Sequence, residues 1–270
     1  MPEGHTLHRL ATELSEAFGG LVVTSSSPQG RFDVGAARID GRVLEHAEAW
    51  GKHLLIDIAG IPERVHVHLG IYGSFVLAAA DQPLVGQIRW RLAIPTATAD
   101  LRGPTACELL DPEAADQLIA RLGPDPLRQD ADPERAWQRI SSSRAPLATL
   151  LMDQRVLSGV GNVYRAELLF RHRVDPDLAG EQLERETFAA MWDDLTVLMR
   201  AGARTGRIDT VAPEHEPAVM GRDPRVDDHG GEVYVYRRTD QPCLVCGTPI
   251  RTRVLAGRNL FWCPSCQQGG

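Results

Sequence analysis

Apolar residues recur at helical spacing near the start of the chain. They fall every three or four positions, so they share one face of a helix: Leu7, Leu10, Ala11, Leu14, Ala17 and Phe18. The pair Gly19-Gly20 follows, and glycine commonly ends helices. The pattern therefore predicts an amphipathic helix that begins just after Gly4 and ends near Phe18.

Six short apolar runs after this helix have the character of β-strands. In residues 87–94, apolar Ile88, Trp90 and Leu92 alternate with arginines, as in a strand with one buried face. The other runs cover residues 21–25, 42–47, 53–58, 64–69 and 74–78. Short strands separated by turns are typical of a β-sandwich or a flattened barrel.

The stretch Gly-Pro-Asp-Pro at residues 123–126 interrupts the pattern, just after a helix predicted over 111–122. We therefore expect a first domain at residues 1–123 and a second domain at 127–231. A third domain is expected at 232–270, where short strands surround four cysteines.

The second domain has the apolar spacing of helices. These helices are predicted over residues 132–140, 145–154, 163–173 and 183–205. Residues 207–231 are polar and contain several prolines and glycines, so they are predicted to form a long mobile loop.

Composition narrows the class of protein. The chain has 270 residues, 43% of them hydrophobic, and a net charge of −7, which does not favour a general polyanion binder. Two zones are nevertheless basic: residues 135–173 hold seven arginines and two acidic residues, and residues 230–270 hold five and two. No apolar run reaches the length of a membrane span and no signal peptide precedes the helix, so we expect a cytoplasmic protein with no membrane partner.

Four of the five cysteines have the spacing of a zinc site. Cys243 and Cys246 form one Cys-x2-Cys pair, and Cys263 and Cys266 form a second pair after sixteen residues. Two such pairs complete a closed tetrahedral site for one structural Zn²⁺ ion, whereas two disulfides are a less favoured alternative in a cytosolic composition. Cys107 lies outside the set and is expected to be a buried apolar residue.

The segment between the cysteine pairs predicts a hairpin with residues 256–259 at its tip, which presents Arg258. A guanidinium on a rigid hairpin suits a phosphate contact, although an ordinary exposed tip residue fits equally well. Upstream, Gly-Val-Gly-Asn at residues 159–162 precedes a predicted helix, and a helix N-terminus attracts anions. Asn162 is then the N-cap of that helix, a phosphate ligand, or both.

The chain begins Met-Pro-Glu-Gly, which has two interpretations. Pro2 and Glu3 suit the first turn of a helix. Alternatively, Met1 is removed and the Pro2 nitrogen acts as a nucleophile with Glu3 as its proton partner; a retained Met1 would make that nitrogen an amide. Lys52 is the only lysine among 29 basic residues, which is weak support for a special role.

Taken in order, the Pro-Glu-Gly start, the Gly-Val-Gly-Asn turn and the four-cysteine hairpin resemble the formamidopyrimidine-DNA glycosylase and endonuclease VIII family. The resemblance covers essentially the whole chain, and the start Met-Pro-Glu-Gly-His-Thr is similar to its actinobacterial endonuclease VIII-like group. It implies an α+β multidomain protein with an N-terminal helix and β-sandwich, a central helix–two-turn–helix module and a C-terminal zinc β-hairpin.

The family resemblance also implies roles for individual residues. Pro2 would attack the sugar C1′ of a damaged nucleotide, with Glu3 as proton donor, Lys52 as a catalytic lysine and Arg258 as the zinc-finger arginine. Asn162, Arg258 and His68 would contact DNA phosphates, and Ile71 with Tyr72 would fill the gap left by a flipped base. Ile71 and Tyr72 are alternatively core residues.

The activity implied is that of a bifunctional DNA glycosylase and AP lyase of base-excision repair. The loop with Ile71 and Tyr72 is closer to the endonuclease VIII type, so oxidised pyrimidines are the expected substrates. The enzyme would act as a monomer on damaged DNA, with one structural zinc ion and no organic cofactor. Alternatives are a formamidopyrimidine and 8-oxoguanine glycosylase of the same fold, or a non-catalytic zinc-dependent protein that binds DNA lesions.

Overall fold

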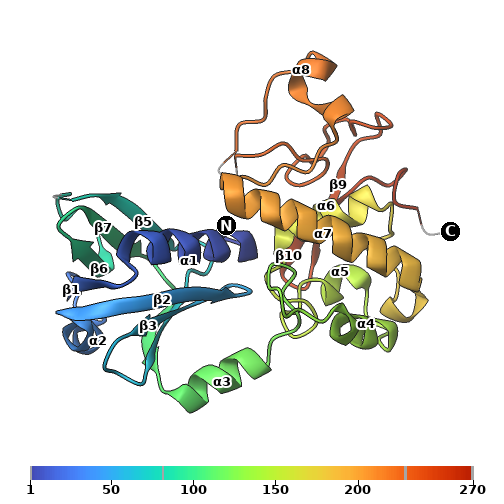
Figure 1. Ribbon diagram of the computed structural model, residues 1–270. Helices are drawn as coiled ribbons and strands as arrows, with labels where there is room; N and C mark the ends of the chain where they lie inside the picture. Colours follow the sequence, from blue (N-terminus) through green and yellow to red (C-terminus); the bar gives the residue numbers. More distant parts are fainter. Residues whose placement is uncertain (1, 81, 228–229, 269–270) are drawn as a thin grey trace. The chain divides into compact units, whose positions relative to one another are not determined.

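The structure, a computed structural model, describes residues 2–80, 82–227 and 230–268 (Figure 1). It divides into two compact units, Met1–Arg121 and Leu122–Gly270. Each unit has its own apolar core. No helix in the described part of the chain is both long and apolar enough to cross a lipid bilayer.

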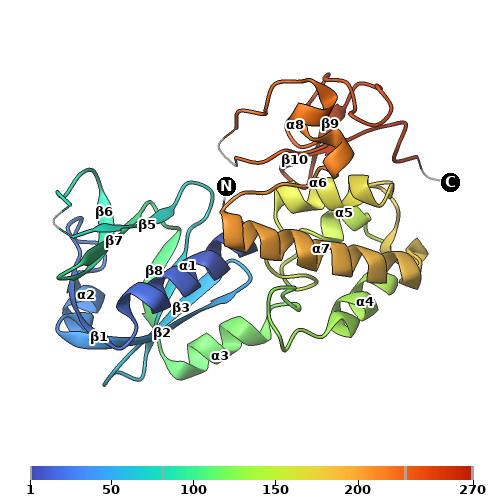
Figure 2. The ribbon, with the colours of Figure 1, turned by 45° about the horizontal axis from the view of Figure 1, so that its top comes forward.

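Helix α1 (Gly4–Phe18) confirms the first sequence prediction. Its apolar stripe is buried, with Leu14 and Phe18 fully enclosed. The helix packs against strands β2 and β3, and both views of the ribbon show it lying along them (Figures 1 and 2). Burial of this stripe fixes the N-terminal end of α1, and with it Pro2 and Glu3, on the sheet.

The first unit contains one antiparallel sheet with the strand order β5-β7-β6-β1-β2-β3-β4-β8. Its strands are β1 (Leu21–Ser26), β2 (Arg42–Trp50), β3 (His53–Ile58), β4 (Arg64–His68), β5 (Ser74–Ala79), β6 (Ile88–Ile94), β7 (Ala97–Arg102) and β8 (Ala106–Leu110). Strand β1 belongs to both halves, because its residues 21–23 pair with β2 and its residues 24–26 pair with β6. The two halves form the expected sandwich, with Trp90 and Leu92 in the core.

Three elements of this unit were absent from the sequence prediction: helix α2 (Asp33–Ile39) and strands β7 and β8. Strand β7 reads Ala-Thr-Ala-Asp-Leu-Arg, in which small residues hide the alternation that usually marks a strand. Its hydrogen bonds to β5 and β6 hold it in the sheet, and that pairing is not visible in local sequence. Helix α3 (Pro112–Ala120) follows β8, and the Asp111 side chain caps it by accepting a hydrogen bond from the backbone N–H of Ala114.

The second unit begins with helices α4 (Pro133–Ser141), α5 (Leu147–Leu150), α6 (Asn162–Arg171) and α7 (Arg185–Thr205), and includes the short helix η1 (Gly180–Gln182). The prediction of a helix over 145–154 is wrong beyond Leu150. Asp153 accepts a hydrogen bond from the backbone N–H of Arg155, and Gln154 donates to the carbonyl of Val160. These local bonds turn the chain towards α6 instead of continuing the helix.

Residues 207–231 are more structured than a plain loop. They contain helices η2 (Pro213–His215) and α8 (Pro217–Met220), and residues 228–229 lie outside the described residues. Arg225 donates to the carbonyls of Gly231 and Tyr236, which ties the segment to the chain that follows it. Its predicted mobility stays a prediction.

The C-terminal hairpin joins the helical core directly. Strands β9 (Arg251–Leu255) and β10 (Arg258–Trp262) pair with each other, and β10 packs on α6 (Figure 2). Glu167 of α6 is completely buried and accepts hydrogen bonds from the backbone N–H groups of residues 234–236 and from the Thr210 hydroxyl. The helices and the hairpin therefore share one core, although the sequence predicted two domains here.

Candidate functional site

Pro2 and Glu3 stand at the N-terminal end of α1. Glu3 occupies the N-cap position and has an exposed fraction of 0%, whereas Pro2 is half-buried. Burial of a carboxylate is costly unless polar partners or chemistry compensate for it, so an acidic residue here is an uncommon choice for a simple helix start. Met1, whose removal the nucleophile hypothesis requires, lies outside the described residues.

Lys52 lies in the two-residue turn that joins β2 to β3. Trp50 and His53 pair across this turn, and Gly51 adopts φ 58°, which a hairpin turn with glycine first requires. Lys52 is half-buried. The rigid turn fixes the backbone from which the only lysine of the chain projects.

Histidine side chains from β3 and β4 gather next to this turn. His53 Nδ1 lies 2.9 Å from His66 Nε2, and His66 Nδ1 lies 3.0 Å from a carboxylate oxygen of Glu108 on β8. The His68 ring centroid lies 4.9 Å from that of His53. Because an ionised carboxylate only accepts hydrogen bonds, His66 donates from Nδ1 to Glu108, and its Nε2 faces His53. His53 and Glu108 were not predicted as members of this cluster, because contacts between separate strands bring them together and no local motif marks them.

This cluster keeps the His53 and His68 imidazoles neutral. Burial, followed by the nearby charges of His66, His68, Arg121 and Lys52, lowers the pKa of His53 to about 3. Burial, then His66 and Lys52, also lowers the pKa of His68. The backbone N–H of Gly70 donates to His68 Nδ1, so neutral His68 carries its proton on Nε2 and presents a hydrogen-bond donor there.

Because the pKa of His53 is lowered in the folded state, we expect the protein to lose stability in acid. The unfolded chain protonates His53 near pH 6.5 and the folded protein only near pH 3, so the free energy of unfolding falls as pH drops through this window. Between pH 7 and pH 5 we expect His53 to account for about 1–2 kcal/mol of that fall. Thermal unfolding of wild type and His53→Gln at both pH values measures it.

The His53→Gln protein should lose less stability between the two pH values than wild type does. Glutamine keeps a donor for His66 but does not titrate. The exposed His46 on β2 provides the matched control, and His46→Gln should retain the wild-type difference. Equal losses in wild type and His53→Gln would contradict a neutral, buried His53.

The loop between β4 and β5 exposes both residues of the expected plug. Ile71 is 49% exposed and Tyr72 is 91% exposed, so the interpretation of these residues as core is wrong. Gly70 adopts φ 68°, and a Cβ there would lie 2.0 Å from the Thr105 hydroxyl oxygen. The loop conformation therefore depends on glycine, and it leaves two large apolar side chains in solvent.

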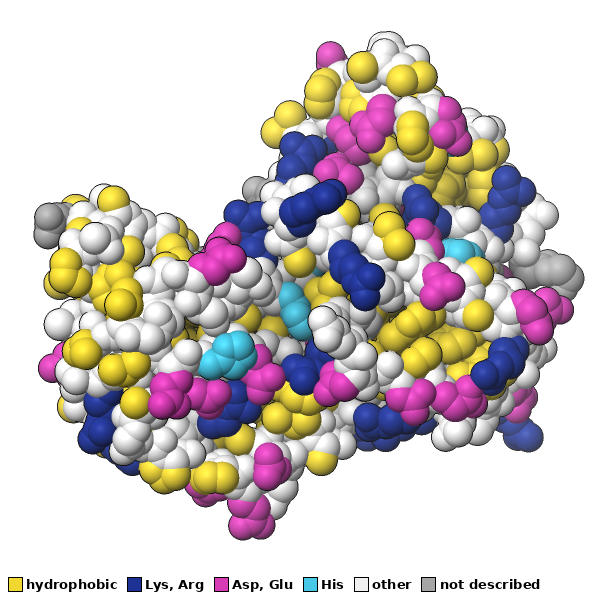
Figure 3. Space-filling view, viewed as in Figure 1, with side chains coloured by type: hydrophobic (Ala, Val, Ile, Leu, Met, Phe, Trp, Pro, Cys, Tyr) yellow, Lys and Arg dark blue, Asp and Glu magenta, His cyan; other side chains and the backbone are white. Residues whose placement is uncertain are grey.

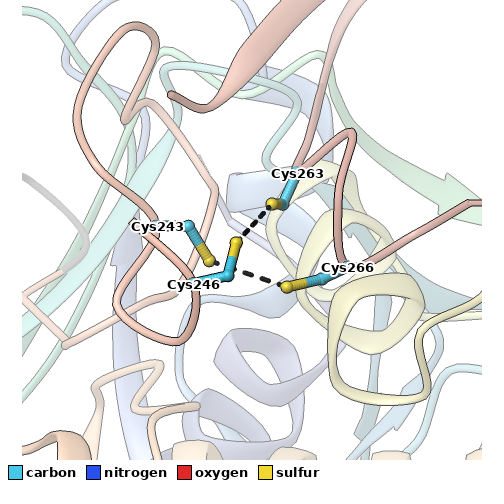
Figure 4. A group of neighbouring side chains, drawn as sticks. All are labelled: Cys243, Cys246, Cys263 and Cys266. Atoms are coloured by element: carbon cyan, nitrogen blue, oxygen red, sulfur yellow. Dashed lines mark hydrogen bonds between the residues drawn. The ribbon is translucent and has the colours of Figure 1, made fainter. Parts of the chain in front are cut away.

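The four cysteines of the C-terminal segment converge on one point (Figure 4). Their sulfur atoms all lie within 4.8 Å of one another, with Cys246 and Cys263 at 3.5 Å and Cys243 and Cys266 at 4.0 Å. A tetrahedron with Zn–S bonds of about 2.3 Å requires S···S distances of about 3.8 Å, so these thiols fit zinc. None of the cysteines forms a disulfide, and burial raises the pKa of Cys107, as expected for a core thiol, to about 12.

Asn162 and the hairpin come together in the second unit. Asn162 is the first residue of α6 and Gly161 is the N-cap, so the N-cap interpretation of Asn162 is wrong. Its side-chain nitrogen donates instead to the carbonyl of Asn259, at 2.9 Å. Arg258 precedes Asn259 and is exposed at the start of β10, next to a tip formed by Ala256 and Gly257 alone, both with positive φ. The tip is thus shorter than predicted.

The basic zones are less open than the sequence indicated. Arg171 forms a bidentate pair with Asp194, Arg155 pairs with Asp153, and Arg165 is only 1% exposed. On the face of the second unit seen in Figure 3, basic side chains are interspersed with acidic ones. The simple count of arginines therefore overstated the positive charge that this zone offers to a polyanion.

Family models match three segments of the chain. The N-terminal domain of formamidopyrimidine-DNA glycosylase matches residues 1–107, its H2TH domain matches 122–212, and the zinc finger found in formamidopyrimidine-DNA glycosylase and isoleucyl-tRNA synthetase matches 240–269. Endonuclease 8 1 of Mycobacterium tuberculosis is 51% identical, over 99% of this chain and 100% of that protein. The chain belongs to the formamidopyrimidine-DNA glycosylase and endonuclease VIII family.

Other family members agree with this result. The probable endonuclease 8 2 of Streptomyces coelicolor is 33% identical over 100% of this chain and 95% of its own, and the formamidopyrimidine-DNA glycosylase of Thiobacillus denitrificans is 31% identical over 99% and 100%. A crystal structure of Lactococcus lactis Fpg, in complex with DNA that contains an abasic site, has the same fold, with a TM-score of 0.80. The match covers 99% of this chain and 100% of that chain, at 20% sequence identity. The sequence-based family resemblance and fold class are confirmed.

Proposed function

We propose that this glycosylase-family member is a bifunctional DNA glycosylase and AP lyase that excises oxidised pyrimidines. The observation that carries the proposal is the buried Glu3 beside Pro2 at the N-terminal end of α1. The endonuclease 8 proteins, at 51% and 33% identity, support the pyrimidine preference over the formamidopyrimidine-DNA glycosylase of T. denitrificans at 31%. We further infer a monomer in the cytoplasm, acting at the nucleoid with one structural zinc ion and no organic cofactor.

The Pro2 nitrogen is the nucleophile of this proposal once Met1 has been removed. An α-amino group titrates near pH 8, so a modest reduction of its pKa leaves much of it neutral at pH 7. The positive end of the α1 dipole favours the neutral amine. The amine then attacks C1′ of the flipped nucleotide, and the base leaves with the electron pair of its C–N bond.

Glu3 supplies the proton transfers. It protonates the deoxyribose ring oxygen as the ring opens to an iminium on Pro2, and the iminium makes the C2′ proton acidic. Glu3, by then a carboxylate, accepts that proton, and the electron pair of the C2′–H bond expels the 3′ phosphate by β-elimination. δ-Elimination of the 5′ phosphate would follow. Lys52, as a second cation of the site, would favour the neutral amine and neutralise phosphate charge.

Residues of both units would hold the DNA. Asn162, at the N-terminus of α6, and Arg258, on the zinc hairpin, are proposed to contact phosphates, and His68 would donate to a phosphate from Nε2. The exposed Ile71 and Tyr72 would fill the space left by the flipped nucleotide, which offsets part of the cost of unstacking.

Borohydride trapping tests the proposal. We expect a covalent adduct when the protein is mixed with a duplex that contains thymine glycol and the imine is reduced. Only the N-terminal amine and Lys52 can form such an imine, because the chain has no other lysine. Peptide mapping of the adduct should therefore place the DNA on Pro2.

Two variants provide controls for this assay. Lys52→Arg should still form the adduct, whereas an N-terminal extension that converts the Pro2 nitrogen into an amide should abolish it. An adduct mapped to Lys52 would make lysine the nucleophile. No adduct on this duplex or on an 8-oxoguanine duplex would favour a non-catalytic lesion-binding protein, and stronger trapping on 8-oxoguanine would favour the formamidopyrimidine type.

A further inference from the structure

Arg165 is a buried cation in the first turn of α6. It is only 1% exposed, and it is among the largest side chains that are fully enclosed in the protein. A positive charge near a helix N-terminus is unfavourable, and burial of a guanidinium adds a desolvation cost. A residue kept here at such a cost requires a specific set of partners.

The partners of Arg165 come from three separate segments. Its Nη1 donates to the carbonyl of Ala148 on α5, at 3.4 Å, and its Nη2 donates to the carbonyl of Asn259 on β10, at 3.0 Å. Nη2 also donates to the side-chain oxygen of Asn162. One guanidinium thus connects the helix–two-turn–helix module to the zinc hairpin, beside Arg258.

These bonds fix the orientation of the Asn162 amide. Its oxygen accepts from Arg165, and its nitrogen donates one hydrogen to the carbonyl of Asn259. The amide nitrogen carries a second hydrogen, which is the group that a phosphate oxygen can accept. A flipped amide would instead turn an oxygen towards the phosphate, and two acceptors repel each other.

We propose that Arg165 is a positioning residue for phosphate recognition, which locks the Asn162 amide with its donor available and holds the start of β10 beside it. This inference rests on the proposed function, in which Asn162 and Arg258 contact the DNA backbone. Arg165 acts through Asn162 and the hairpin, and it does not itself touch the DNA.

The test is a double-mutant cycle on DNA affinity. The probe is a duplex with a tetrahydrofuran abasic analogue, which lacks an oxygen substituent at C1′ and so cannot form the iminium that leads to strand cleavage. We expect Arg165→Met and Asn162→Ala each to weaken binding about 10-fold to 30-fold, and the double variant to be no weaker than the worse single variant. Arg165→Lys, which keeps the charge and one donor, should recover part of the affinity.

Arg238 is the matched control. It is 8% exposed in the same unit and also donates to backbone carbonyls, those of Tyr234 and Pro242. Arg238→Met should therefore lower the thermal stability without selective loss of DNA binding. If Arg165→Met does not fold, Arg165→Lys takes its place in the cycle with Asn162→Ala.

Two results would overturn the role of Arg165: losses that multiply in the double variant, or an equal loss of affinity in Arg238→Met. A different result tests the proposed function: a wild-type protein that does not prefer the abasic duplex over undamaged DNA would contradict lesion recognition itself. A wild type with that preference and multiplied losses would reject only the assignment of Arg165.

Discussion

Replacement of Glu3 by glutamine should yield a protein that binds damaged DNA but excises the base about 10²-fold to 10⁴-fold more slowly. Glutamine has nearly the same shape as glutamate, so it fills the same fully buried space at the start of α1. It does not transfer a proton at neutral pH, and the sugar ring then opens without an acid. Single-turnover excision of thymine glycol, measured together with affinity for an abasic analogue, separates chemistry from binding.

The matched control for this prediction is Glu45→Gln, which removes an exposed carboxylate from β2 in the same unit. It should excise the base at the wild-type rate. A Glu3→Gln protein that retains the wild-type rate would remove Glu3 from the chemistry. Strand cleavage at a preformed abasic site should fall with excision, because the same carboxylate is proposed to take the C2′ proton.

Local sequence predicted the parts of the fold that have a strong period or a fixed spacing. Helix α1 has an unbroken apolar stripe, and the two Cys-x2-Cys pairs define their own geometry, so both were visible without a structure. Strand β7 and the end of α5 were not visible in this way. Pairing with β5 and β6 determines the strand, and the hydrogen bond from Gln154 to the Val160 carbonyl turns the chain after α5.

The candidate site likewise has residues that a local motif predicts and residues that only the fold brings together. Pro2, Glu3 and the cysteines follow from motifs, whereas the chain of bonds through His53, His66 and Glu108 joins three strands and has no local sequence signal. Arg165 was counted as part of a basic zone, but the fold turns it inward to Asn162 and Asn259. Burial decides whether a charge faces a ligand or supports another residue, and the sequence does not report burial of single charged side chains.

Removal of the zinc should unfold the hairpin, weaken the whole second unit and abolish tight DNA binding. Structural zinc contributes about 10–16 kcal/mol of binding free energy at pH 7, which is comparable to the stability of an entire domain. The effect should extend beyond the hairpin, because Ile250, Leu260 and Phe261 lie in the same core as the helices. Gln267 strengthens this link, since it accepts from the Cys263 N–H and donates to the carbonyl of Val174.

Chelation under mild denaturant, and the variant Cys246→Ser, provide the measurement, with zinc content, thermal unfolding and DNA affinity followed together. Cys107→Ala is the matched control, because Cys107 lies in the core of the first unit and outside the cysteine cluster, so this variant should retain its zinc. The first unit has a separate core, so hydrogen exchange should show it still protected when the second unit has opened. Tight DNA binding by zinc-free protein would contradict the structural role, since Arg258 and Asn259 would then hold their places without the metal.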